Sequence, residues 1–103
     1  MSRSLKWLPE ALKDLARLRD FIRVHNPEAA QRAATRILDA AHKLLILPNI
    51  GHPVLNLDTP QLRDLFLPFG QAGYWLRYYA ADHEVIVVRV WHGREDRDPA
   101  RTL

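Results

Sequence analysis

The chain has 103 residues, of which 48% are hydrophobic and 26% are charged, and this length and composition predict one globular domain over residues 1–103. It contains no cysteine, which excludes disulfides and thiolate chemistry, and no apolar run approaches the roughly 20 residues that cross a bilayer. The net charge of +3 is smaller than a strong nucleic-acid binder usually carries. We therefore expect a cytoplasmic domain that neither enters a membrane nor reads a DNA sequence directly.

Two helices are predicted in the N-terminal half, after a short strand over residues 3–7 in which polar and apolar side chains alternate. The first helix begins at Pro9 and ends near His25. Its expected buried face comprises Leu8, Ala11, Leu12, Leu15, Leu18, Phe21 and Ile22. The second helix follows at once, with Asn26 as N-cap and Pro27 in its first turn. So short a connection permits only an antiparallel helical hairpin.

Three strands are predicted in the C-terminal half, because the hydrophobic pattern changes from the helical to the strand period after a rigid loop at residues 47–53. These strands cover residues 61–67, 74–79 and 85–92, and residues 93–103 form a polar, partly loose tail. The expected fold class is α+β with the order β-α-α-β-β-β. Its antiparallel helical hairpin covers one face of a small, mainly antiparallel sheet.

The uncovered face of this sheet is the strongest candidate for a binding surface. Ile86, Val88 and Val90 form an apolar row that we expect to face the helices, with Val85, Val87, Arg89 and Trp91 in the opposite row. The open face should then present Trp75, Arg77, Tyr79, Arg89 and Trp91. Aromatic rings and guanidiniums dominate protein-binding hot spots and also stack on RNA. The alternative is that the C-terminal tail folds back and covers them.

Motifs of catalysis are absent from the sequence, which has no glycine-rich phosphate loop, no metal-binding histidine spacing and no nucleophile elbow. We therefore expect neither a cofactor nor a metal. His92 ends the last strand beside Arg94, where its imidazole can act as a general acid or base or simply bond to the backbone. The carboxylates of Glu10 and Asp14 lie one helical turn apart and are expected to be solvated.

Five phrases of the sequence carry a family resemblance through their order and spacing, and they occupy residues 7–15, 26–30, 47–53, 62–70 and 85–96. From about residue 5 to residue 98, the chain resembles the RelE/ParE superfamily of type II toxins, and within it the ParE-like (plasmid stabilisation) branch. The resemblance implies a growth-inhibiting toxin that a cognate antitoxin neutralises. ParE-like members poison DNA gyrase, whereas RelE-like members cleave mRNA on the ribosome.

The RelE-like cleavage site uses several basic side chains and often a tyrosine around the scissile phosphate, and most of these have no match here. Phe66 and Pro68 fall where two lysines are expected, Trp75 falls where an arginine is expected, and only Arg94 keeps a basic residue. Because phosphoryl transfer depends on placed positive charge, the resemblance favours a toxin that binds gyrase without a catalytic residue.

Two interpretations stay open beside gyrase binding. The same residues are expected to bind the partner in all three cases. The first alternative is a ribosome-dependent endoribonuclease that uses His92, Arg77 and Arg94. The second is a domain that has lost its toxicity but still holds the antitoxin. The residues expected to bind the target or the antitoxin are Trp75, Arg77, Tyr79, Arg89, Trp91, His92, Arg94 and Arg97.

Overall fold

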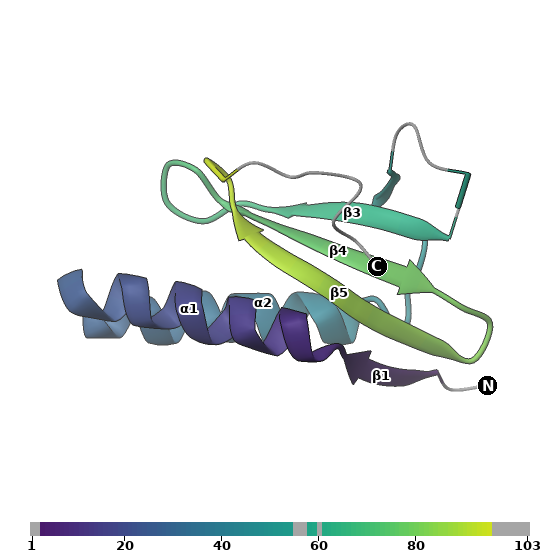
Figure 1. The fold of residues 1–103 in the computed structure, drawn as a ribbon, viewed down its shortest axis with the longest axis horizontal. Coiled ribbons are helices and arrows are strands. Elements are labelled where there is room, and N and C mark those ends of the chain that lie inside the picture. Colours follow the sequence, from purple (N-terminus) through teal and green to yellow (C-terminus); the bar gives the residue numbers. More distant parts are fainter. Residues whose placement is uncertain (1–2, 55–57, 60, 96–103) are drawn as a thin grey trace.

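Two helices pack on one face of a five-stranded mixed sheet in the computed structural model, which describes residues 3–54, 58–59 and 61–95 (Figure 1). The elements are β1 (Ser4–Trp7), α1 (Pro9–His25), α2 (Pro27–Lys43), β2 (His52–Pro53), β3 (Leu62–Leu67), β4 (Tyr74–Ala80) and β5 (Glu84–His92). The strand order is β1-β5-β4-β3-β2, and only β1 and β5 run parallel. The α+β class and the order of helices and strands are confirmed.

The two helices meet at Asn26, which ends one and begins the other. Its backbone is extended, with φ −161° and ψ 100°, and its N–H donates to the carbonyl of Ile22. Its side-chain oxygen accepts a hydrogen bond from the backbone N–H of Ala29 at 3.0 Å. Pro27 supplies the first residue of α2, where a missing N–H costs nothing. The predicted start of the first helix and the predicted junction at Asn26 are confirmed, whereas α2 ends at Lys43, before Leu44 and Leu45, which we expected on its apolar face.

The buried face of α1 is narrower than expected. Ala11 and Leu18 are buried, but Leu12 and Phe21 are 52% and 68% exposed, so their assignment to that face is wrong. Asp14, which we expected to be solvated, is only 4% exposed. The helix therefore turns a carboxylate toward the sheet within its apolar stripe. None of the helices in the described ranges is long and apolar enough to cross a membrane.

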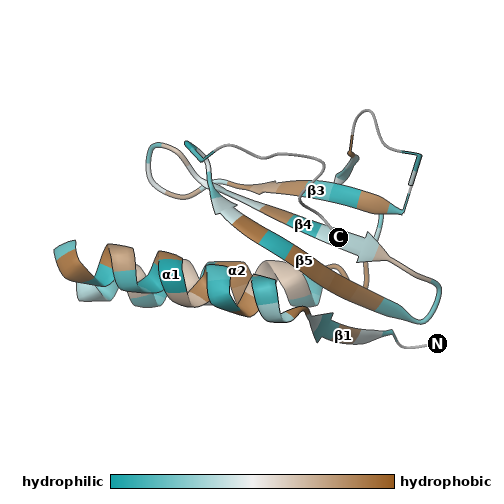
Figure 2. Ribbon diagram, viewed as in Figure 1, coloured by the Kyte–Doolittle hydropathy of each residue, from teal (hydrophilic) through white to brown (hydrophobic). Residues whose placement is uncertain are grey.

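A β-bulge in β5 decides which side chains face the helices. Arg77 pairs with Arg89 and Tyr78 pairs with Val87, so Val88 is an extra residue that reverses the alternation of faces. Val85, Val87 and Val90 consequently belong to the core beneath the helices. The predicted positions of Val85, Val87, Ile86 and Val88 are wrong, and those of Val90, Arg89 and Trp91 are right. In Figure 2, β5 is a hydrophobic strand interrupted by a hydrophilic band.

The face of the sheet opposite the helices has a small core of its own. Val54, Leu62 and Val88 form it, and Leu8 and Tyr79 pack against it. Val54 follows the two-residue strand β2, and its backbone N–H donates to the carbonyl of Leu62 at 3.0 Å. The sequence did not predict β2, because two residues carry no periodicity. The expectation that the chain has nothing to cover this face is therefore wrong.

Candidate functional site

Asp14 closes the edge of β5 at the point where β1 stops. β1 pairs with β5 only as far as Val87, and Leu8 adds one more bond to the Val87 carbonyl before the chain enters α1. The next N–H on this edge belongs to Val90, and it donates to Oδ2 of Asp14 at 3.0 Å. A buried N–H needs such a partner, so the carboxylate takes the place of a neighbouring strand.

The same carboxylate holds Arg89 in a two-point ion pair. Nε of Arg89 lies 2.7 Å from Oδ2 of Asp14, and Nη2 lies 3.1 Å from Oδ1. The side chains of Arg89 and Asp14 are only 19% and 6% exposed, so water screens the pair weakly. The hydrogen bond to Asp14 raises the pKa of Arg89 above its ordinary value. The largely buried guanidinium of Arg89 is therefore neutralised by the carboxylate of Asp14.

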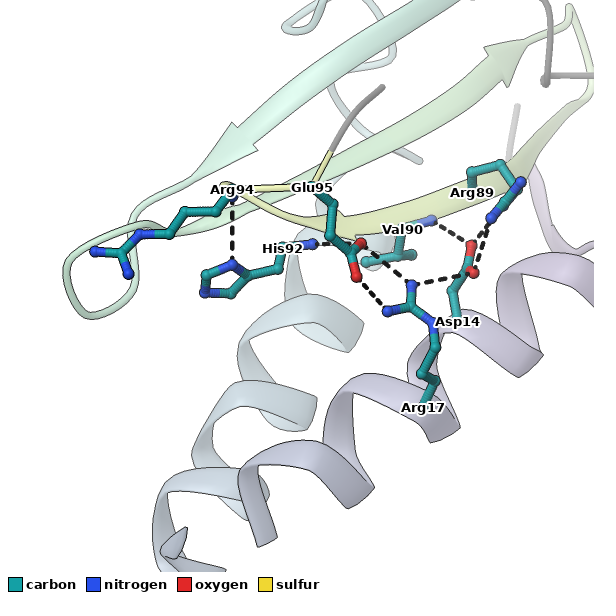
Figure 3. A network of polar contacts seen from close by, with 7 residues as sticks. All are labelled: Asp14, Arg17, Arg89, Val90, His92, Arg94 and Glu95. Atoms are coloured by element: carbon teal, nitrogen blue, oxygen red, sulfur yellow. Dashed lines mark hydrogen bonds and ion pairs between the residues drawn. The ribbon is translucent and has the colours of Figure 1, made fainter. Parts of the chain in front are cut away.

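Arg17 connects this pair to the turn after β5 (Figure 3). Its Nη2 lies 3.5 Å from Oδ1 of Asp14 and 3.2 Å from Oε2 of Glu95, and its Nη1 also bonds Glu95. The hydrogen bond to Glu95 raises the pKa of Arg17. Oε2 of Glu95 in turn accepts the backbone N–H of His92 at 3.2 Å. One chain of charged contacts therefore joins α1 to the end of β5.

His92 and Arg94 border a shallow hollow at this end of the sheet. The hollow has a volume of about 320 Å³, and its lining includes Tyr74 and Phe69. The ring of His92 meets that of Tyr74 edge to face at 5.7 Å, and its Nδ1 accepts the backbone N–H of Arg94 at 3.3 Å. The neutral imidazole consequently carries its proton on Nε2. In Figure 3 this ring points away from the pair of Arg17 and Glu95.

A second buried ion pair lies on the face opposite the helices. Nε and Nη2 of Arg77 bond the two carboxylate oxygens of Asp64 at 2.7 and 2.8 Å. The guanidinium carbons of Arg77 and Arg89 lie 4.9 and 5.2 Å from the ring centre of Trp91. Both cations are close enough for attraction to the ring.

The predicted open face therefore exists only in part. The register places Trp75, Arg77, Tyr79, Arg89 and Trp91 in neighbouring rows, but Arg77 and Trp91 are 2% and 3% exposed. Trp75, Tyr79 and Arg89 stay partly accessible. The exposure expected for Arg77 and Trp91 is wrong, because the sequence did not reveal the carboxylate facing each arginine. Arg97 and residues 96–103, which were expected to bind a partner or to cover this face, lie outside the described residues.

Asp14, Arg17, Asp64 and Glu95 were missed as parts of this site. Asp14 gave one signal, because it lies three residues after Ala11 and four before Leu18, within the buried stripe of α1. An acid at such a position needs a buried partner. Across the residues that the structure describes, His, Asp and Glu form no group of three that could hold a metal ion.

Known proteins share both this sequence and this fold. The family described as the ParE toxin of the type II toxin–antitoxin system parDE matches residues 5–97. The chain belongs to this family. It is 41% identical to Toxin RelE2 of Caulobacter vibrioides over 86 residues, which cover 84% of the chain and 90% of that protein. It is 32% identical to Toxin RelE3 of the same organism over 95 residues, covering 92% of the chain and 99% of that protein.

Solved structures of two toxin–antitoxin systems share the fold of this toxin. A chain of the chromosomal ParDE system of P. aeruginosa matches with a TM-score of 0.68 and 24% identity, covering 87% of this chain and 95% of that one. A chain of the RelBE2 toxin–antitoxin complex of Mycobacterium tuberculosis matches with a TM-score of 0.63 and 21% identity, covering 89% and 99%. The resemblance to the RelE/ParE superfamily is thereby confirmed, and the chain is a toxin of a type II toxin–antitoxin system.

Proposed function

We propose that this toxin inhibits growth by binding DNA gyrase, without cleaving RNA, and that its cognate antitoxin blocks the binding surface. The observation that carries the proposal is the neutralisation of the arginines around the end of β5. Arg89 bonds Asp14, Arg17 bonds Glu95, and Arg77 bonds Asp64. Phosphoryl transfer needs positive charge that is free to stabilise a developing anion, and these guanidiniums are already committed to carboxylates.

The hollow beside His92 supports the same proposal. Among the described residues that line it, Arg94 is the one basic side chain apart from the imidazole. Phe66, Pro68 and Trp75 provide no cation at the positions where RelE-like members carry lysine or arginine. The exposed Arg94 and the partly exposed His92 instead border the hollow beside Phe69 and Tyr74, and this mixture of aromatic and basic side chains suits contact with a protein.

One observation favours ribosome-dependent mRNA cleavage as a second candidate function. His92 and Arg94 share the hollow with Tyr74, so a proton donor and a cation lie side by side. The relatives in Caulobacter vibrioides also bear the name RelE. In this mechanism the ribose 2′-hydroxyl would attack the phosphorus and give its proton to water. The bond to the 5′-oxygen would break as a protonated His92 donated its Nε2 proton to that oxygen, while Arg94 balanced the phosphate charge.

The test runs two assays on one preparation of the purified toxin. The first measures DNA supercoiling and DNA cleavage by gyrase, and the second measures mRNA cleavage on translating ribosomes. We expect inhibited supercoiling, accumulated DNA breaks and intact mRNA, with supercoiling restored by the antitoxin. Cut mRNA with unaffected gyrase would refute the proposal, and loss of that cutting in His92→Ala would then support the second candidate. A toxin inactive in both assays would also contradict gyrase binding.

A further inference from the structure

The loop between β3 and β4 forms one wall of the hollow beside His92. The N–H of Gly73 donates to the carbonyl of Phe69 at 2.8 Å, and this hydrogen bond closes the loop on itself. The ring of Phe69 packs on that of Tyr74 with 5.7 Å between the ring centres. The loop residues that line the hollow are Phe69, Gly70, Gln71 and Ala72. Because the loop is closed, a shift at Ala72 also moves Phe69.

The turn after β5 forms the opposite wall of the hollow. Tyr74 pairs with His92, and the N–H of Gly93 continues this pairing by donating to the carbonyl of Gly73 at 2.9 Å. The turn itself is closed by a hydrogen bond of 2.9 Å from the N–H of Glu95 to the carbonyl of His92. In Figure 1 the β3–β4 loop and the end of β5 lie side by side. Gly93 therefore lies where the two walls of the hollow touch.

The space at Gly93 is too small for any side chain. A Cβ at this position would overlap the carbonyl oxygen of Ala72, and it would lie 2.8 Å from the carbonyl carbon of the same residue. It would also lie 3.3 Å from the carbonyl oxygen of Gly73. These atoms belong to the main chain, so no side-chain rotation can relieve the overlap. A substitution at Gly93 must therefore push the β3–β4 loop and the turn after β5 apart.

The distance between these two walls determines how the side chains of the hollow are presented. His92 and Arg94 flank Gly93 on one wall, and Phe69 lies on the other. A surface that is already in its binding conformation binds more tightly, because less free energy is lost in ordering side chains on contact. Separation of the walls should therefore weaken binding of the target even when the rest of the fold is kept.

We propose that Gly93 is a positioning residue of this toxin, because its missing side chain lets the β3–β4 loop close on the turn after β5. Closure holds Phe69, His92 and Arg94 in the arrangement that the target binds. Gly93 acts through these neighbours and does not itself contact the target. The inference rests on the proposed function in taking the hollow as the target-binding surface, but it does not require that the target is gyrase.

The first measurement compares Gly93→Ala with a second crowded glycine, in Gly51→Ala. A Cβ at Gly51 would lie 2.8 Å from the ring of Tyr78 and 2.9 Å from the carbonyl oxygen of Asp64, and Gly51 is not among the described residues that line the hollow. Both variants are assayed at equal concentrations of folded toxin. Gly93→Ala should raise the toxin concentration that half-inhibits gyrase supercoiling by about tenfold or more, and Gly51→Ala should leave it unchanged.

Growth of cells that express each variant separates this inference from the choice of target. At equal amounts of soluble toxin, Gly51→Ala should arrest growth and Gly93→Ala should not. An unmodified toxin that arrests growth but does not inhibit gyrase would refute gyrase binding, and the growth comparison would still test Gly93. Full activity of Gly93→Ala would overturn the inference. An equal loss in both variants would overturn it too, because Gly93 would then act through stability alone.

The second measurement is hydrogen exchange at the amide of Gly93 in the unmodified toxin, so it does not depend on how a variant folds. Because this N–H bonds the carbonyl of Gly73, it should exchange at least tenfold more slowly than in an unstructured peptide of the same sequence. Exchange at the rate of the unstructured peptide would show that the loop does not close on the turn, and this result would also overturn the proposal.

Discussion

Replacing Asp14 by asparagine should destabilise the toxin more than any other single neutralisation of an acid on α1. The change keeps the size of the side chain but removes its charge and one of its two acceptor oxygens. Oδ2 now serves both the backbone of Val90 and Nε of Arg89. The single oxygen of the amide cannot replace both carboxylate oxygens, and the amide carries no charge. Arg89, whose side chain is only 19% exposed, therefore loses its ion pair.

The magnitude follows from the contacts that are lost. Leaving a buried charge without its partner costs about 3–5 kcal/mol, and partial exposure of Arg89 lowers this to about 2–3 kcal/mol. Arg17 adds little, because its side chain is 47% exposed. Against a total stability of about 5–15 kcal/mol, such a loss should lower Tm by roughly 10–20 °C.

The assay is denaturant unfolding of Asp14→Asn beside Asp20→Asn. Asp20 lies on the same helix and pairs with Arg23 at 3.2 Å, but its side chain is 54% exposed. Its neutralisation should change the free energy of unfolding by less than about 0.5 kcal/mol. The amide of Val90 should also exchange faster in Asp14→Asn than in the unmodified toxin. If the two variants unfold at the same denaturant concentration, the carboxylate does not hold the edge of β5 and the reasoning fails.

Three further predictions concern local features of the fold. Burial raises the pKa of Tyr74, so this phenol stabilises the fold below about pH 10 and loses that contribution as the pH rises through its raised pKa. Tyr74→Phe should therefore reduce the fall of Tm at alkaline pH. An unchanged dependence of Tm on pH would contradict this. Gly73→Ala places a Cβ 2.5 Å from the ring of Phe66 at φ +70°, whereas Gly70→Ala meets nothing within 4 Å at φ +60°. Both should lose about 1 kcal/mol through backbone strain, and chemical denaturation should show a further loss for Gly73→Ala alone. Asn26→Ala removes the N-cap of α2 and should cost about 1 kcal/mol in the same measurement, so full stability would show that the cap is dispensable.

Local sequence signals were sufficient for the helical hairpin. Asn26 and Pro27 act through contacts within a few residues, so their roles can be predicted from the sequence. His92 and Arg94 are two residues apart in the sequence, so their positions beside one hollow also follow from local structure. Where a single strand or turn determines the placement of a side chain, composition and spacing carry enough information.

Contacts between distant segments could not be predicted in this way. Val85 to Val88 are all apolar, so nothing in their pattern marks Val88 as the extra residue of a bulge. The partner of Arg17 is 78 residues away at Glu95. That pairing depends on the packing of α1 against β5, which the sequence alone does not specify. The candidate surface was consequently predicted as more open and more charged than it is.

The two edges of the sheet differ in how their backbone groups are covered, and this difference connects stability to binding. The edge of β5 is covered by β1 and then by Asp14, which already accepts the N–H of Val90. On the outer edge of β3, the described residues place a strand only beside Arg63 and Asp64, which pair with β2. Covering an edge with charge, as at Asp14, prevents unwanted pairing between copies of a chain. Among the described residues, the contact that stabilises this end of β5 is therefore also the one that keeps a partner strand from bonding the N–H of Val90.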